Sequence, residues 1–161
     1  MNDKNLTKKV FEELKKQGLY EQEDTIEDED GENENKSEGS NDQFCEIICK
    51  LLHSQTQVHI LHLQTTSYSE HKALQGYYEG IDALVDGLVE SYQGKHGLLK
   101  NYKTFDMVDY KSNDQLIKYF KELLEIISDN RDSVKESYLQ NQIDTIEELI
   151  NSTVYKLKFL K

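Results

Sequence analysis

The apolar residues of the last quarter of the chain constrain its fold most strongly. Between residues 139 and 160 they recur at alternating steps of four and three, at Leu139, Ile143, Ile146, Ile150, Thr153, Leu157 and Leu160. That spacing places them on one face of a helix, and such a face must pack against another element. Strand-type alternation appears nowhere at length. The pattern therefore predicts an all-helical fold.

Three earlier segments repeat the helical spacing. The first begins near Ser40 and extends to the polar reversal at residues 65–69, the second spans about residues 69–93, and the third begins near Asn113. Gly94 is expected at the C-terminus of the second helix, because glycine is the favoured residue just after a helix. The apolar connection at residues 97–112 is expected to pack across the bundle. Residues 43–161 are thus predicted to form a four-helix bundle with a long second-to-third crossover.

Charge divides the chain into three parts. The whole chain has 31 acidic and 19 basic residues, a net charge of −12. Residues 1–20 carry five lysines and three acids, which describes a basic N-terminal arm. Residues 21–42 carry eleven acids, one lysine and a single apolar residue, so they are expected to be a disordered acidic linker. The predicted bundle has 17 acids and 13 bases, a net charge of only −4.

Composition also excludes several classes of function. The acidity argues against binding to duplex DNA or to anionic lipid, because both require clustered Lys and Arg. No apolar run reaches the roughly 20 residues of a transmembrane helix, and residues 1–5 lack the apolar core of a secretory signal. Cys45 and Cys49 lie four apart in a helical pattern, which favours reduced thiols and a cytoplasmic location.

Four ionisable residues form the candidate site. His59 and His71 lie six residues on either side of Thr65, so a helical hairpin turning there would bring their imidazoles together. Asp86 and Glu90 are one helical turn apart, on the same helix as His71. They lie about 22–28 Å beyond it at 1.5 Å per residue, too far for one metal ion to contact all four in one chain. Two copies of this helix crossing antiparallel would bring them together, with a two-fold axis near residue 80.

A strip of small residues lies next to that axis, at Ala73, Gly76, Gly80, Ala83 and Gly87. It is expected to allow close approach of another helix, which would offset the cost of glycine inside a helix. The alternatives remain open at this point. The second helix can simply tolerate glycine, the acidic stripe of Glu79, Asp82, Asp86 and Glu90 can be a solvated face, and His59 and His62 can be histidines at the edge of the core.

The four candidate residues form a motif of two histidines twelve residues apart, an Asp fifteen residues after the second histidine, and a Glu four residues after the Asp. This motif resembles the ferroxidase centre of the miniferritins, the DNA-binding proteins from starved cells (Dps), in the ferritin-like superfamily. This resemblance implies that His59 and His71 of one subunit, with Asp86 and Glu90 of its two-fold mate, bind iron and oxidise it with peroxide or O₂. It implies protection against oxidative damage and a homo-oligomer of twelve subunits, whereas the two-chain ligand set by itself requires at least a two-fold dimer. Residues 62–65 and 89–95 are also similar to uncharacterised phage and large-virus proteins, which implies host cytoplasm or virion as the location.

The chain departs from the miniferritin pattern in ways that bear on activity. Gln75 stands where those proteins usually carry an Asp ligand, Ile60 stands where they favour Trp, and no Lys-rich DNA-binding tail is present. The site suits Fe(II), with Zn or Mn as competitors, and Gln75 implies one tight metal position and slower oxidation. The alternative function is a helical viral accessory protein without ferroxidase activity, which contacts a protein partner through residues 1–42.

Overall fold

The computed structural model describes residues 37–160, with side chains from Gln43 onward, and within this range the fold is all-helical. The elements are α2 (Ser37–Gln64), α3 (Tyr68–His96), α4 (Asn113–Asn130), a short 3₁₀ turn η2 (Arg131–Ser133) and α5 (Ser137–Phe159). The predicted basic arm and most of the predicted acidic linker lie outside the described residues.

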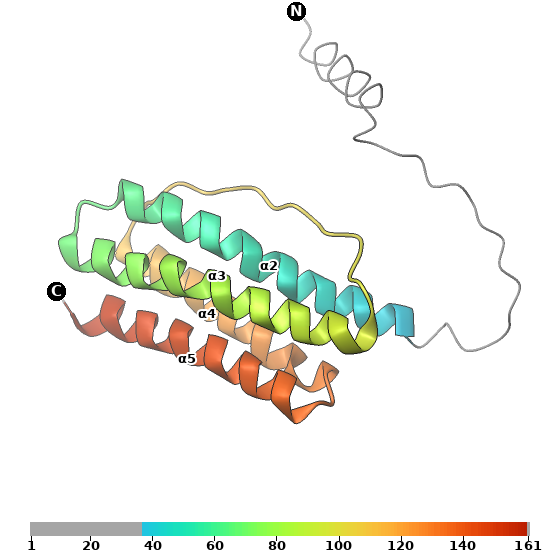
Figure 1. Cartoon of the computed structure of the whole chain (residues 1–161). Coiled ribbons are helices and arrows are strands. Elements are labelled where there is room, and N and C mark those ends of the chain that lie inside the picture. Colours follow the sequence, from blue (N-terminus) through green and yellow to red (C-terminus); the bar gives the residue numbers. More distant parts are fainter. Residues whose placement is uncertain (1–36, 161) are drawn as a thin grey trace, which may run out of the picture. The chain divides into compact units, whose positions relative to one another are not determined.

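The four long helices form the predicted bundle with its crossover (Figure 1). Helix α2 packs mainly on α3, α3 on α5, and α4 on α5, and α2 makes a smaller contact with α4. The connection at residues 97–112 leaves the end of α3, runs back along α2 and delivers the chain to the start of α4 (Figure 1). One end of the bundle therefore contains the α2–α3 turn, the start of α4 and the end of α5.

The core contains most of the apolar positions predicted from the helical spacing. In α5 the six predicted positions from residue 139 to 157 are buried, and the structure adds Val154. Leu52 and Leu160 are exceptions, with 42% and 49% of their surface exposed. Leu160 is the first residue after α5, where the buried helical face has already ended. None of the described helices is both long and apolar enough to cross a bilayer.

Side chains of α2 hold the crossover in place. The amide of Gln57 donates to the Val108 carbonyl and accepts from the Val108 N–H, both at 2.7 Å. Gln64 binds the Asp109 carboxylate at 2.8 Å and the Tyr110 N–H at 2.7 Å. Each glutamine thus satisfies polar groups of an extended segment that has no neighbouring strand. The crossover packs on the bundle as predicted, although Leu98 and Met107 on it remain exposed.

The two cysteines belong to the same contact. The Cys45 thiol donates to the Lys100 carbonyl at 3.1 Å, and the Lys103 N–H donates to the Cys49 sulfur at 3.2 Å. Both side chains are buried, and neither is in a disulfide. Their spacing of four residues reflects one face of α2 packed against the crossover, as expected for small packed residues.

Two predicted helix boundaries differ from the structure. Helix α2 begins at Ser37, three residues before the start expected at Ser40. Helix α3 continues through Gly94 to His96, and Gly97 is the residue that ends it, with a φ of 85°. Glycine adopts this left-handed backbone without the steric penalty that a Cβ atom brings. The expected role of Gly94 therefore belongs to Gly97.

The strip of small residues on α3 faces α5 of the same chain. A Cβ atom built on Gly80 would lie 3.4 Å from Leu149, one on Gly76 would lie 3.8 Å from the Lys156 ammonium, and one on Gly87 would lie 3.9 Å from Gln142. The expectation of close helix packing along this strip is confirmed for Gly80. Packing on α5 accounts for Gly80, whereas Gly76 and Ala83 of the same strip are exposed.

Replacing Gly76 by Ala is expected to stabilise the protein by about 0.5–1 kcal/mol, because alanine restricts the unfolded chain and favours the helix. The only atom that the new methyl group would meet within 4 Å is the far end of the flexible Lys156 side chain. Urea unfolding measures the change, and light scattering checks the assembly. A loss of stability or of assembly would instead indicate that another backbone lies against Gly76.

An ion-pair cluster joins the end of α3 to the start of α5. The Lys95 ammonium lies 2.5 Å from the Glu136 carboxylate, and His96 Nε2 lies 3.3 Å from the same oxygen. The Glu136 side chain is only 9% exposed. The hydrogen bond from Lys95 and a backbone hydrogen bond lower the pKa of Glu136 from its usual 4.5 to about 2.

This depressed pKa predicts how stability changes in acid. The ionised Glu136 contributes stability above its unfolded pKa, and the contribution falls as the pH drops from about 4.5 towards 2, where the folded carboxylate also takes a proton. In wild type the free energy of unfolding should therefore fall more steeply over this range than in Glu136→Gln. Urea titrations of both proteins between pH 6 and pH 2 measure the difference, and parallel curves would contradict the prediction.

Candidate functional site: a histidine cluster and an acidic stripe

Four aromatic side chains cluster beside the α2–α3 turn. His59 and His62 come from the last turns of α2, and His71 and Tyr78 come from the first half of α3. The rings of His62 and His71 are stacked with centroids 3.7 Å apart, and those of His59 and Tyr78 are stacked at 4.2 Å. His62 lies between the two stacks, 5.9 Å from His59 and edge-on to Tyr78 at 5.1 Å.

His62 and His71 bind each other's backbone as well. His62 Nδ1 donates to the His71 carbonyl at 2.9 Å, and His71 Nδ1 donates to the His62 carbonyl at 3.2 Å. The His62 carbonyl lies in the last turn of α2, where carbonyl groups lack helical partners. The pair therefore closes the helical hairpin by satisfying a group that the helix end leaves unpaired.

These hydrogen bonds determine which ring nitrogen can bind a metal. A carbonyl oxygen can only accept, so Nδ1 of both rings must carry the hydrogen. In the neutral imidazole, Nε2 then has the lone pair, and this arrangement of a histidine on a backbone carbonyl is typical of metal ligands. His71 is partly exposed, so its Nε2 is the better placed of the two for a ligand role, whereas His62 is 6% exposed.

The predicted pairing of His59 with His71 is wrong in detail. Within the part of the chain that the structure describes, the ring contacts join His71 to His62, and His59 to Tyr78. The non-helical turn spans residues 65–67, so its centre lies one residue later than the assumed centre at Thr65. His59 and His71 therefore belong to one cluster but are separated by His62, which the sequence suggested only as a histidine at the edge of the core.

The predicted carboxylate ligands lie on a continuous polar stripe of α3. An α-helix rotates by about 100° per residue, so residues three or four apart lie on the same side of α3. The stripe begins at His71 and continues through Gln75 to the exposed acids Glu79, Asp82, Asp86 and Glu90. Among the described residues Asp82, Asp86 and Glu90 form no ion pair or hydrogen bond. Like charges four residues apart cost about 0.2–0.5 kcal/mol per pair. A cation or a donor from another molecule would offset this repulsion.

Within the described part of one chain, the candidate ligands do not come together at a metal site. The described residues contain no group of three or more His, Cys, Asp or Glu side chains that could hold a metal ion. This agrees with the separation of about 28 Å between His71 and Glu90 along α3. The donor set nevertheless fits a transition metal, because it combines neutral imidazole nitrogens with unpaired carboxylates on one exposed face.

Glu70 is a buried carboxylate that the sequence interpretation missed. It is 8% exposed and accepts hydrogen bonds from Thr65 Oγ1 at 2.6 Å, from the Tyr110 hydroxyl at 2.9 Å and from Asn113 Nδ2 at 2.9 Å. Glu70 thus joins the α2–α3 turn, the crossover and the start of α4. The available signal was the capping-box spacing, since Ser67 is the N-cap of α3 and accepts from the Glu70 N–H.

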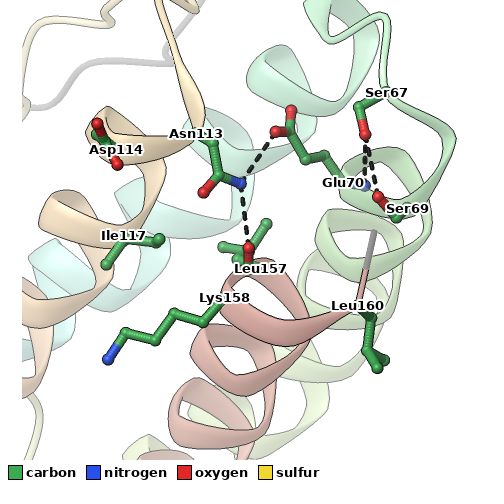
Figure 2. Close-up of a pocket in the computed structure, with 9 residues that line it drawn as sticks. All are labelled: Ser67, Ser69, Glu70, Asn113, Asp114, Ile117, Leu157, Lys158 and Leu160. Atoms are coloured by element: carbon green, nitrogen blue, oxygen red, sulfur yellow. Dashed lines mark hydrogen bonds between the residues drawn. The ribbon is translucent and has the colours of Figure 1, made fainter.

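An open cavity of about 530 Å³ adjoins Glu70 at this end of the bundle. Figure 2 shows Asn113 between the Glu70 carboxylate and the Leu157 carbonyl, with the Lys158 ammonium directed away from Glu70. The polar groups around Glu70 are therefore paired with one another. We assign this network to the structure of the bundle end, where it binds three segments together.

A second histidine environment lies under the crossover. His53 Nε2 contacts the Asp106 carbonyl at 3.3 Å, its ring packs edge-on against Phe105, and burial lowers the pKa of His53. Small cavities of about 200 and 290 Å³ flank it between α2 and α4. His53 lies two turns of α2 before His59–His62, and no ring contact connects it to their cluster in the described chain.

Comparison with known proteins identifies a family. Residues 62–157, more than half of the chain, match DUF5856, a family of unknown function. The matched segment contains His62, His71, Asp86 and Glu90 but begins after His59. No curated protein and no solved structure matches the chain. The chain therefore belongs to the DUF5856 family.

Proposed function

We propose that this protein is a miniferritin-like ferroxidase that binds and oxidises Fe(II) at a site shared by two copies of the chain, in the cytoplasm of a cell. The observation that carries the proposal is the α3 stripe. It has a histidine with a free Nε2 at one end and two unpaired carboxylates at the other, with His59 beside the histidine end. The bundle with a long crossover supports it, because ferritin-like folds connect their helices in this way.

An antiparallel dimer through α3 would complete the site. With the two-fold axis between residues 80 and 81, His71 lies opposite Glu90 of the second copy and Gln75 lies opposite Asp86. Each dimer would then hold two equal sites, each with His59 and His71 from one chain and Asp86 and Glu90 from the other. The cations would also neutralise the carboxylates that the dimer brings together.

In this site the imidazoles bind Fe(II), and the carboxylates favour the more highly charged ferric product. Two Fe(II) ions each lose one electron, and one hydrogen peroxide molecule takes both electrons with two protons and leaves as two water molecules. Removal of Fe(II) and peroxide together would protect the cell from oxidative damage. Gln75 accepts from Lys72 at 2.5 Å and donates to Glu79 at 2.8 Å, so it supplies no anionic ligand. We therefore propose one tight metal position in each site.

The proposal is tested by measuring bound iron and peroxide-driven Fe(II) oxidation for wild type and for His59→Ala/His71→Ala. Wild type should bind iron and oxidise it, and the double variant should lose most of both activities. A double variant that binds and oxidises as much iron as wild type would contradict the proposal.

A second candidate function is that of a helical interaction protein without iron chemistry. The observation that favours it is a set of exposed apolar side chains at the end of the bundle that holds the α2–α3 turn and the end of α5: Leu63, Tyr68, Phe159 and Leu160. Exposed apolar groups gathered at one place are typical of contact surfaces. Wild type that binds no iron would favour this second function over the first.

A further inference from the structure

We propose that His62 is a positioning residue, whose ring holds His71 in the orientation and tautomer that present Nε2 as a metal ligand. The inference rests on the proposed function for the identity of His71 as a ligand. Its structural basis is independent of that function, because it lies in the stack and the reciprocal hydrogen bonds of the two side chains.

The stack limits how the His71 ring can move. With centroids 3.7 Å apart and planes inclined by 25°, the His62 ring covers one face of His71. His62 is itself held, since it is 6% exposed, its Nδ1 binds the His71 carbonyl, and Tyr78 packs against it edge-on. A buried ring fixed on several sides is a rigid support for a partly exposed one.

The orientation in turn selects the tautomer. In the stacked position His71 Nδ1 lies 3.2 Å from the His62 carbonyl oxygen and donates to it. Without that hydrogen bond a neutral histidine in water prefers the hydrogen on Nε2, which blocks the exposed nitrogen. A ligating histidine usually has its second nitrogen bound to a carbonyl or carboxylate, and loss of such a partner typically weakens metal binding 10–100-fold.

His62 is not itself expected to be a ligand. Its ring is buried against His71, whereas His71 remains partly exposed beside the acidic stripe. Two stacked imidazoles direct their lone pairs within their own ring planes, here inclined by only 25°, which does not suit binding one ion between them. His62 therefore acts through His71.

Three substitutions at position 62 separate the contributions in the full-length protein. His62→Phe retains a ring for the stack but no Nδ1 donor, His62→Asn retains a donor at the place of Nδ1 but no ring, and His62→Ala retains neither. His53→Ala is the matched control, because His53 is on the same helix and also contacts a backbone carbonyl.

Two measurements are made on each protein. Nitrogen-15 spectra of the metal-free imidazoles report which nitrogen of His71 carries the hydrogen, and competition with a coloured chelator gives the Zn(II) dissociation constant. Wild type, His62→Phe and His53→Ala should show hydrogen on Nδ1 of His71 and similar Zn(II) affinities. His62→Asn and His62→Ala should move hydrogen to Nε2 and bind Zn(II) 10–100-fold more weakly.

Each outcome decides between the inference and the proposed function. A wild-type tautomer of His71 in both His62→Asn and His62→Ala overturns the positioning role, as does a His62→Phe protein as defective as His62→Ala. If the tautomer changes as expected but wild type binds neither Zn(II) nor Fe(II), the proposed function fails and the positioning role stands. If circular dichroism shows that His62→Ala does not fold, the His71 tautomer is compared between His62→Phe and His62→Asn. The positioning role then requires hydrogen on Nδ1 in His62→Phe and on Nε2 in His62→Asn.

Discussion

Two inactive variants of this protein are expected to regain iron oxidation when they are combined in one dimer. One variant is His59→Ala/His71→Ala and the other is Asp86→Asn/Glu90→Gln. Each alone should lose nearly all Fe(II) oxidation, because every site lacks half of its ligands. In a mixed dimer one site receives both defective halves, and the other receives both intact halves.

Random mixing gives a quantitative expectation. Half of the dimers are mixed and each holds one intact site, so co-expressed variants should recover about a quarter of the wild-type activity per subunit. Differently tagged chains allow the mixed species to be purified and assayed. The control is Glu79→Gln/Asp82→Asn, which neutralises two other acids of the same stripe and should retain activity. An inactive mixture beside an active wild type would show that the ligands do not come from two chains.

Removing the carboxylate of Glu70 is expected to cause a large loss of stability, although Glu70 is a polar residue outside the apolar core. Glu70→Ala removes the acceptor that Thr65, Tyr110 and Asn113 share at a position where the Glu70 side chain is only 8% exposed. Buried donors without partners cost about 1–3 kcal/mol each, and relaxation recovers part of this. The free energy of unfolding in urea should fall by about 2–4 kcal/mol.

Two further variants make the Glu70 prediction specific. Glu70→Gln retains an oxygen for Asn113 and offers an amide to the two hydroxyls, which can accept in turn, so its cost should be about 1 kcal/mol. Glu148→Gln changes an exposed acid of α5 and should stay within about 0.5 kcal/mol of wild type. If Glu70→Ala costs no more than Glu148→Gln, the network does not hold the bundle end together.

Much of the fold could be predicted from the sequence because helix periodicity is a local property. The spacing of Leu139, Ile143 and Ile150 requires a helix with one buried face wherever the helix is placed. The boundaries were less well determined. Gly94 and Gly97 are both plausible helix ends by composition, and only the backbone shows that Gly97 takes the positive φ.

The sequence by itself determined the four helices, the crossover and the positions of the imidazoles and carboxylates along them, since these follow from residue type and spacing. Only the tertiary structure decided which side chains meet. The α2–α3 turn is centred on Thr66 and not on Thr65, and in the folded chain the His71 ring stacks on His62 instead of His59. The packing of α5 on α3 assigns Gly80 of the small-residue strip to a contact within the chain. Contacts across helices depend on their relative register and rotation, and residue spacing within one helix does not contain that information.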